Sequence, residues 1–99
     1  MTINKITEGT QLTVEIEGRI DTQTAPELEK ELEASLQEAE DLVLDFARVN
    51  YISSAGLRTV IKAQNWMEDK GGTMVIRNAD KNIVNIFKVT GFDTFLTLE

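Results

Sequence analysis

Apolar and polar residues alternate near the start of the chain, which is the pattern of a strand with one buried and one solvated face. In residues 12–16 every second position is aliphatic, and threonine or glutamate stands between them. Gly18 ends the alternation. Residues 8–10 have the composition of a turn, so residues 2–7 are predicted to form a partner strand.

A helix is predicted over about residues 24–39, because apolar positions recur there at helical spacing. Thr24 followed by Glu27 matches a capping box, and Pro26 is tolerated in the first turn of a helix. The apolar stripe consists of Leu28, Leu32, Leu36 and Ala39. The acidic residues between them are Glu27, Glu29, Glu31 and Glu33. They could suggest cation binding, but a solvated outer face is the better interpretation.

Residues 42–46 are mostly apolar and are predicted to form a short strand, buried on both faces in the centre of a sheet. A second helix is predicted from Ser54 to about Lys70, where Gly71-Gly72 ends it. Its inner stripe consists of Leu57, Val60, Ile61, Gln64 and Met67. Trp66 lies off this stripe. It is predicted to pack on the third helix, and an exposed contact residue is the alternative.

Residues 73–77 have the composition of another strand, and residues 94–98 are predicted to form the last one. Between them Asp80 is predicted to cap a third helix, which Gly91 ends. The element order is therefore β-β-α-β-α-β-α-β. Strands separated by helices imply parallel pairing in the interior of a sheet. The pattern predicts an α/β fold, in a single domain that spans residues 1–99.

The composition excludes several kinds of chemistry. The chain has 99 residues and a net charge of −7, and it contains neither cysteine nor histidine. An acidic surface repels phosphate backbones, so nucleic-acid binding is not expected. A Ser-His-Asp triad, a thiol nucleophile and metal sites of imidazole or thiolate are excluded. No signal peptide or membrane-spanning stretch is visible, so we expect a cytoplasmic protein without membrane insertion.

Two adjacent serines, Ser53 and Ser54, lie where the buried strand gives way to the second helix. Free N–H groups and the positive end of the helix dipole suit an anion or a phosphoryl group there. Gly56 would let a phosphate or another chain come close. The alternative is that a serine caps the helix, and both can hold because one serine suffices. A nucleophile elbow is not supported, since Ile52 stands where that motif needs glycine.

Asp21 lies between a strand and the first helix, where it could cap a turn or contact a partner. The carboxyl ends of neighbouring parallel strands gather at one edge of a sheet. Asp21 follows one strand and Ser53 follows another. Asp21 and the turn at residues 53–56 are therefore predicted to form one partner-binding surface.

Three motifs, in order along the chain, resemble those of one family. Gly18-Arg19-Ile20-Asp21 is similar to its Gly-x-Leu/Ile-Asp signature. Residues 45–57, which end in Ser53-Ser54-Ala55-Gly56-Leu57, resemble its central strand followed by Asp-Ser-Ser/Ala-Gly-Leu. Val89-Thr90-Gly91-Phe92 resembles a common ending. The family is the STAS domain, named for sulfate transporters and anti-sigma factor antagonists, and the resemblance spans the whole chain.

The resemblance implies a mixed β-sheet with helices against one face, and a partner-switching role without catalysis or cofactor. Such a protein binds an anti-sigma factor that is also a serine kinase, and so frees a sigma factor. The kinase phosphorylates the family serine, which breaks the complex, and a serine phosphatase restores it. By position the phosphorylated serine is Ser54. The implied partner-binding residues are Asp21, Ser53, Ser54, Ala55 and Gly56.

One position departs from the family pattern. The family usually has an acid directly before the phosphorylated serine, and here the residue is Ser53, which becomes a rival acceptor. The alternative function is that of an unphosphorylated assembly subunit in a transporter or signalling complex. Similar domains have this role in lipid-transport ATPase complexes.

Overall fold

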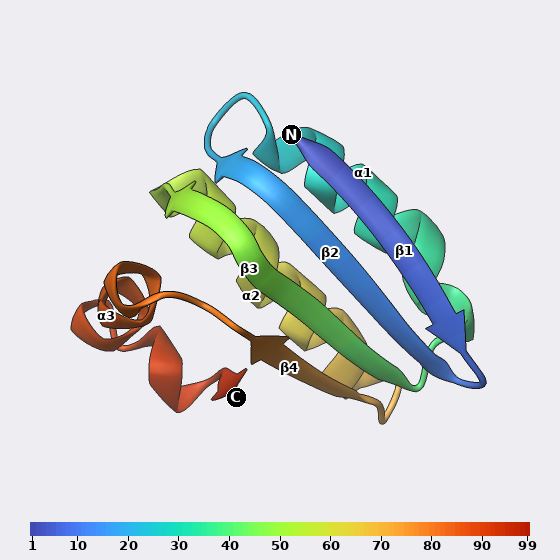
Figure 1. The fold of residues 1–99 in the computed structure, drawn as a ribbon. Coiled ribbons are helices and arrows are strands. Elements are labelled where there is room, and N and C mark those ends of the chain that lie inside the picture. Colours follow the sequence, from blue (N-terminus) through green and yellow to red (C-terminus); the bar gives the residue numbers. More distant parts are fainter.

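The computed structural model describes residues 1–99 and shows a five-stranded sheet with helices behind it (Figure 1). The strands are Thr2–Glu8 (β1), Gln11–Ile20 (β2), Asp41–Ile52 (β3), Thr73–Arg77 (β4) and Thr97–Leu98 (β5). The helices are Ala25–Ser35 (α1), Ser54–Asp69 (α2) and Lys81–Val89 (α3), with 3₁₀ turns at Leu36–Glu38 (η1) and Phe92–Thr94 (η2). The strands lie in the order β1-β2-β3-β4-β5. Only β1 and β2 are antiparallel, so the sheet is mixed as predicted.

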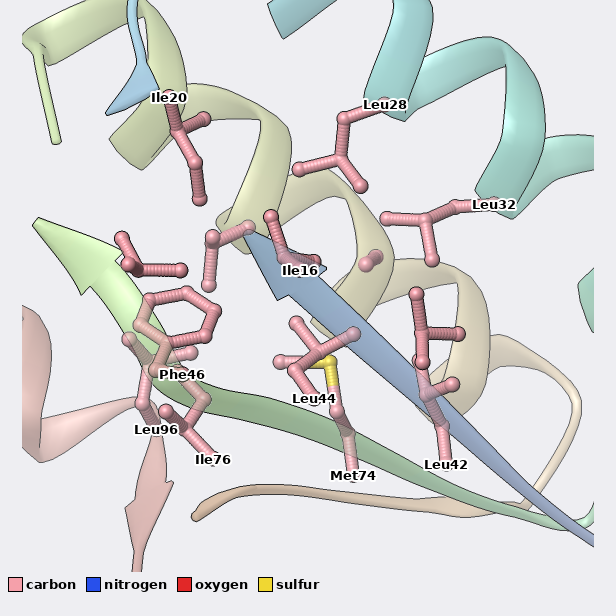
Figure 2. Packing of buried hydrophobic residues seen from close by; sticks show 14 of the residues in the cluster. Ile16, Ile20, Leu28, Leu32, Leu42, Leu44, Phe46, Met74, Ile76 and Leu96 are labelled. Atoms are coloured by element: carbon pink, nitrogen blue, oxygen red, sulfur yellow. The ribbon is translucent and has the colours of Figure 1, made fainter. Parts of the chain in front are cut away.

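One hydrophobic core joins the helices to one face of the sheet (Figure 2). Leu28 and Leu32 of α1 and Val60 of α2 are fully buried against the strands. The rings of Phe46 in β3 and Phe87 in α3 lie 6.4 Å apart and connect the third helix to the same core. Burial of this apolar surface is the main force that holds the layers together. The predicted α/β fold with helices on one face is confirmed.

The other face of the sheet carries no helix (Figure 1). β3 lies at the centre of the sheet, as predicted, and Val43 is buried on this face between the neighbouring strands. Asp45, two residues further on, is only half-buried. The prediction that this strand is buried on both faces therefore holds at Val43 and fails at Asp45.

β3 is longer than predicted, because it continues past Phe46 to Ile52. Its pairing with β2 shifts register between Glu15 and Glu17 and again after Gly18. These irregularities insert extra residues into β3, so buried positions recur there at every third residue and break the period of two. Gly18 has φ +108°, which favours glycine, and it marks a bulge. Gly18 ends the apolar alternation of the sequence, while the strand itself continues to Ile20.

α1 begins without the predicted capping box. Thr24 has ψ −22°, a helical value, and its side chain makes no cap hydrogen bond. The hydroxyl of Thr24 instead donates to the carbonyl of Arg19 at 2.8 Å and accepts from the N–H of Asp21 at 2.8 Å. A threonine bound in this way belongs to the turn before the helix. The helix itself ends at Ser35, and η1 covers the remainder of the predicted span.

The C-terminal third follows the prediction more closely. The carboxylate of Asp80 accepts from the N–H of Ile83 at 2.9 Å and caps α3 as predicted. The last strand is shorter than residues 94–98, because Phe92–Thr94 forms η2 and pairing begins at Thr97. No helix of the chain combines the length and the apolar character needed to cross a bilayer.

Trp66 is partly buried and packs against the core, as predicted, but beside another helix. It lines a groove of about 390 Å³ with Leu36 and Gln37, which lie in η1 directly after α1. The prediction that it packs on the third helix is therefore wrong.

Candidate functional site

The candidate site lies at the carboxyl ends of β2 and β3. Ile20 pairs with Ile52 in the parallel ladder, so Asp21 and Ser53 leave the sheet side by side. The N–H of Ser53 donates to the carbonyl of Ile20 at 2.8 Å and ties the two strand ends together. The structure thus brings Asp21 and the turn at residues 53–56 to one edge, as the sequence predicts.

Asp21 shapes the loop that leads into α1. Its Oδ1 atom accepts from the N–H groups of Gln23 at 3.0 Å and Thr24 at 3.1 Å. The pKa of Asp21 lies below its usual value, mainly because the backbone N–H of Thr24 donates to the carboxylate. Hydrogen bonds from Gln23 and Arg19 lower it further by smaller amounts. The carboxylate is therefore charged near neutral pH and bound to its own loop. This geometry bears out the interpretation that Asp21 caps a turn, and its contact with a partner stays a prediction.

Arg19 and Tyr51 lie beside Asp21, and the sequence pattern gave no sign that either belongs to the site. They are paired across β2 and β3, and the guanidinium carbon lies 4.2 Å from the centre of the tyrosine ring. Arg19 Nε also lies 3.5 Å from Asp21 Oδ2. Tyr51 is one of four large hydrophobic residues that are exposed, at 39%. This pair can be recognised only from the register of β2 and β3. The bulges shift that register, so the alternation of residues along either strand does not predict that Arg19 and Tyr51 are neighbours.

The two serines differ in their hydrogen bonds. Ser53 is the N-cap of α2, with extended backbone, and its Oγ accepts from the N–H of Gly56 at 3.2 Å. Ser54 is the first helical residue and is exposed, and its hydroxyl makes no hydrogen bond within the chain. Ser53 is half-buried. One serine therefore caps the helix, which leaves the hydroxyl of the other available.

Gly56 is buried, and the close approach that it permits is internal. A Cβ atom at this position would lie 2.7 Å from Ile20 Cγ2 and 2.8 Å from the Ile20 carbonyl oxygen. Glycine is thus required because α2 packs directly on the end of β2. The expectation that Gly56 admits a phosphate or another chain is replaced by this internal contact.

A groove runs between the N-terminal halves of α1 and α2, next to the serines. We call it the α1–α2 groove; its volume is about 240 Å³. Its lining residues are Thr22, Ala25, Pro26, Glu29, Ala55, Arg58, Thr59 and Lys62. An ion pair of 2.8 Å between Lys62 Nζ and Glu29 Oε1 crosses it. Ala55 therefore connects the serine turn to a charged groove that the sequence pattern does not predict.

The chain belongs to the STAS domain family: residues 4–98 match the family described as MlaB, STAS domain. It is 33% identical over 78 residues to BtrV of Bordetella bronchiseptica, a protein named as an anti-sigma factor antagonist, covering 78% of this chain and 67% of the relative. It is 26% identical over 85 residues to the anti-sigma-B factor antagonist of Bacillus subtilis, covering 86% of this chain and 78% of the relative.

Solved structures of the Bacillus anti-sigma factor antagonist SpoIIAA share the fold. The unphosphorylated form matches with a TM-score of 0.78 at 11% identity, covering 99% of this chain and 87% of the other. The phosphorylated form matches with a TM-score of 0.77 at 12% identity, covering 99% of this chain and 91% of the other. The resemblance stated from the motifs is thereby confirmed at the level of the family and the fold.

Proposed function

We propose that this chain is a cytoplasmic anti-sigma factor antagonist that is switched by phosphorylation of Ser54. In the unphosphorylated form it binds an anti-sigma factor that is also a serine kinase, and a sigma factor is released. Transfer of the γ-phosphoryl group of ATP to the Ser54 hydroxyl ends the interaction, and a serine phosphatase reverses it. The observation that carries the proposal is the exposed hydroxyl of Ser54, which has no hydrogen bond within the chain.

Ser54 suits a kinase better than Ser53 does. Phosphorylation of Ser53 would turn the Oγ atom that accepts from the N–H of Gly56 into a weaker ester acceptor, and it would act on a half-buried side chain. Phosphorylation of Ser54 breaks no hydrogen bond of the chain. The acid that usually precedes the family serine is replaced here by Ser53, which also caps helices well. Ser53 therefore fills the structural role that an acid would have at this position.

The proposed partner surface comprises Asp21 and residues 53–55, with Gly56 buried beneath them, and Arg19 and Tyr51 extend it. A tyrosine ring under a guanidinium offers a large contact area at low cost in conformational entropy, and Tyr and Arg are common anchors of interfaces. Asp21 contributes mainly by holding the loop, because its Oδ1 atom is occupied by backbone N–H groups.

Phosphorylation is expected to exclude the partner without unfolding the chain. A phosphate at the start of a helix interacts favourably with the dipole, by ~0.3–1 kcal/mol at an exposed site. The acidity of the chain offsets part of that gain, and both effects are small beside the ~5–15 kcal/mol of a folded domain. Inside an interface, a dianion costs desolvation and steric clash that readily exceed ~2 kcal/mol. Partner affinity should therefore fall by about thirty-fold or more.

The test begins with the chain expressed in its native cells at wild-type level. Mass spectrometry should locate a phosphate on Ser54, and the Ser54→Ala variant should lack it while it still captures an ATP-binding serine kinase. The Ser53→Asp variant is the matched control, since it keeps a cap and should still be phosphorylated. A phosphate found on Ser53, or none under any growth condition, would contradict the proposal.

A second function is an unphosphorylated assembly subunit of a transport complex. Membership of the STAS domain family favours it, because the domains that this chain resembles include subunits of lipid-transport ATPases. In that case the chain should co-purify with membrane-transport subunits and not with a kinase, and Ser54→Ala should have no effect on sigma-dependent transcription.

A further inference from the structure

Arg58 is the one arginine of the chain without an ionic partner. The other three pair as follows: Arg19 with Asp21, Arg48 with Glu17 and Arg77 with Glu99. Arg58 is exposed and enters neither an ion pair nor a side-chain hydrogen bond. In a chain with 17 acidic and 10 basic side chains, this guanidinium is free to bind an added anion.

The surroundings of Arg58 leave it available to an anion. It lines the α1–α2 groove, where the other charged groups are Glu29 on α1 and Lys62 on α2. Glu29 is already paired with Lys62 at 2.8 Å, so these two charges largely cancel. The groove therefore has a net positive charge, which the guanidinium of Arg58 carries.

Arg58 follows Ser54 by four residues in the same helix. Side chains four residues apart are neighbours on a helix surface, with Cβ atoms about 5–6 Å apart. Long helical side chains also lean toward the N-terminus of their helix, which directs Arg58 toward the turn that holds Ser54. A guanidinium can bind two phosphate oxygens at once, which a lysine ammonium does not do.

We infer that Arg58 is the ion-pair partner of the phosphate group on Ser54. This inference rests on the proposed phosphorylation of Ser54, and it identifies the side chain that binds the phosphate group. The paired phosphate withdraws the guanidinium from the α1–α2 groove and leaves only the Lys62–Glu29 pair there. Phosphorylation thus changes the partner surface twice: it adds a dianion at the start of α2, and it removes the unpaired positive charge beside Ala55.

The experiment needs neither kinase nor partner. Phosphoserine is incorporated at position 54 during translation, and its second pKa, ordinarily about 6, is followed by ³¹P NMR as pH is raised. A guanidinium stabilises the dianion, so Arg58→Gln should raise this pKa by about 0.2–0.7 units, the range that corresponds to an exposed ion pair. Arg58→Lys should raise it by less. The helix dipole is the same in all these proteins and cancels from the comparison.

Two controls make the result specific. Lys62→Gln removes an equal charge from the same groove and should change the phosphoserine pKa by less than half as much as Arg58→Gln. Arg48→Gln, whose side chain pairs with Glu17 on the sheet, should leave it unchanged. Equal pKa values in wild type and Arg58→Gln, or equal shifts from Arg58→Gln and Lys62→Gln, would overturn the inference.

The role of Arg58 and the proposed function can be refuted independently of each other. If phosphorylation abolishes partner binding but the pKa is insensitive to Arg58→Gln, the function stands and the role of Arg58 is wrong. If the pKa shifts as expected but native cells never phosphorylate Ser54, the ion pair exists and the proposed function is wrong.

Discussion

The difference between the two serines leads to a quantitative prediction for Ser53→Ala. This variant removes the Oγ atom that accepts from the N–H of Gly56 and leaves a helix N-terminus without a side-chain cap. Loss of an N-cap costs about 0.5–2 kcal/mol of unfolding free energy. The cap bond is long, at 3.2 Å, and the backbone bond from Ser53 N–H to Ile20 survives, so a value near the middle, about 1 kcal/mol, is expected.

Thermal unfolding followed by circular dichroism measures this loss. For a domain of this size, about 1 kcal/mol lowers the melting temperature by roughly 4–8 °C. Ser54→Ala is the matched control: its hydroxyl has no hydrogen bond, so the unfolding free energy should change by no more than about 0.5 kcal/mol. Ser53→Asp should restore the melting temperature, since Asp caps as well as Ser and complements the helix dipole. If Ser54→Ala destabilises as much as Ser53→Ala, the assignment of cap and free acceptor is refuted.

Three further predictions concern packing, charge and catalysis. Gly56→Ala should lower the unfolding free energy by about 1–3 kcal/mol in urea titrations, because a Cβ would meet Ile20 Cγ2 at 2.7 Å; a gain in stability, as expected from helix propensity alone, would contradict this. The folded-state pKa of Asp21 is lowered, so its carboxylate stabilises the fold above the ordinary value of 3.8 and the effect fades as pH falls below it. The difference in melting temperature between wild type and Asp21→Asn should accordingly be largest above pH ~5 and shrink toward pH ~3, and a constant difference would exclude this role. Pure protein should not hydrolyse a generic ester, and turnover that Ser54→Ala abolishes would show a catalytic serine.

The strongest sequence signals were those of regular periodicity. The alternation over residues 12–16 predicted the middle of β2, and the apolar stripe from Leu57 placed the start of α2 at Ser54, where the structure has it. A regular pattern identifies which face is buried, and burial dominates the energy of such elements. The same reasoning failed at the bulges, where one strand has extra residues and the period of β3 changes from two to three.

Local motifs were less reliable where several backbone groups compete for one side chain. Thr24 and Glu27 have the spacing of a capping box, but the Thr24 hydroxyl is used by the tight turn around Asp21. The pairing of Arg19 with Tyr51 depends on strand register, which no spacing within a single strand reveals. The importance of Arg58 depends on which carboxylates lie near it in space, so only the folded chain could indicate it.

The measurement that tests the central claim most directly compares the phosphorylated and unphosphorylated chains with one partner. The kinase captured by unphosphorylated protein is purified, and its affinity for both forms is measured by calorimetry, together with the melting temperature of each form alone. We predict that phosphorylation of Ser54 lowers the affinity by about thirty-fold or more, while the melting temperature moves by only a few degrees. Unchanged affinity, or unfolding of the chain on phosphorylation, would contradict a switch that acts by excluding the partner.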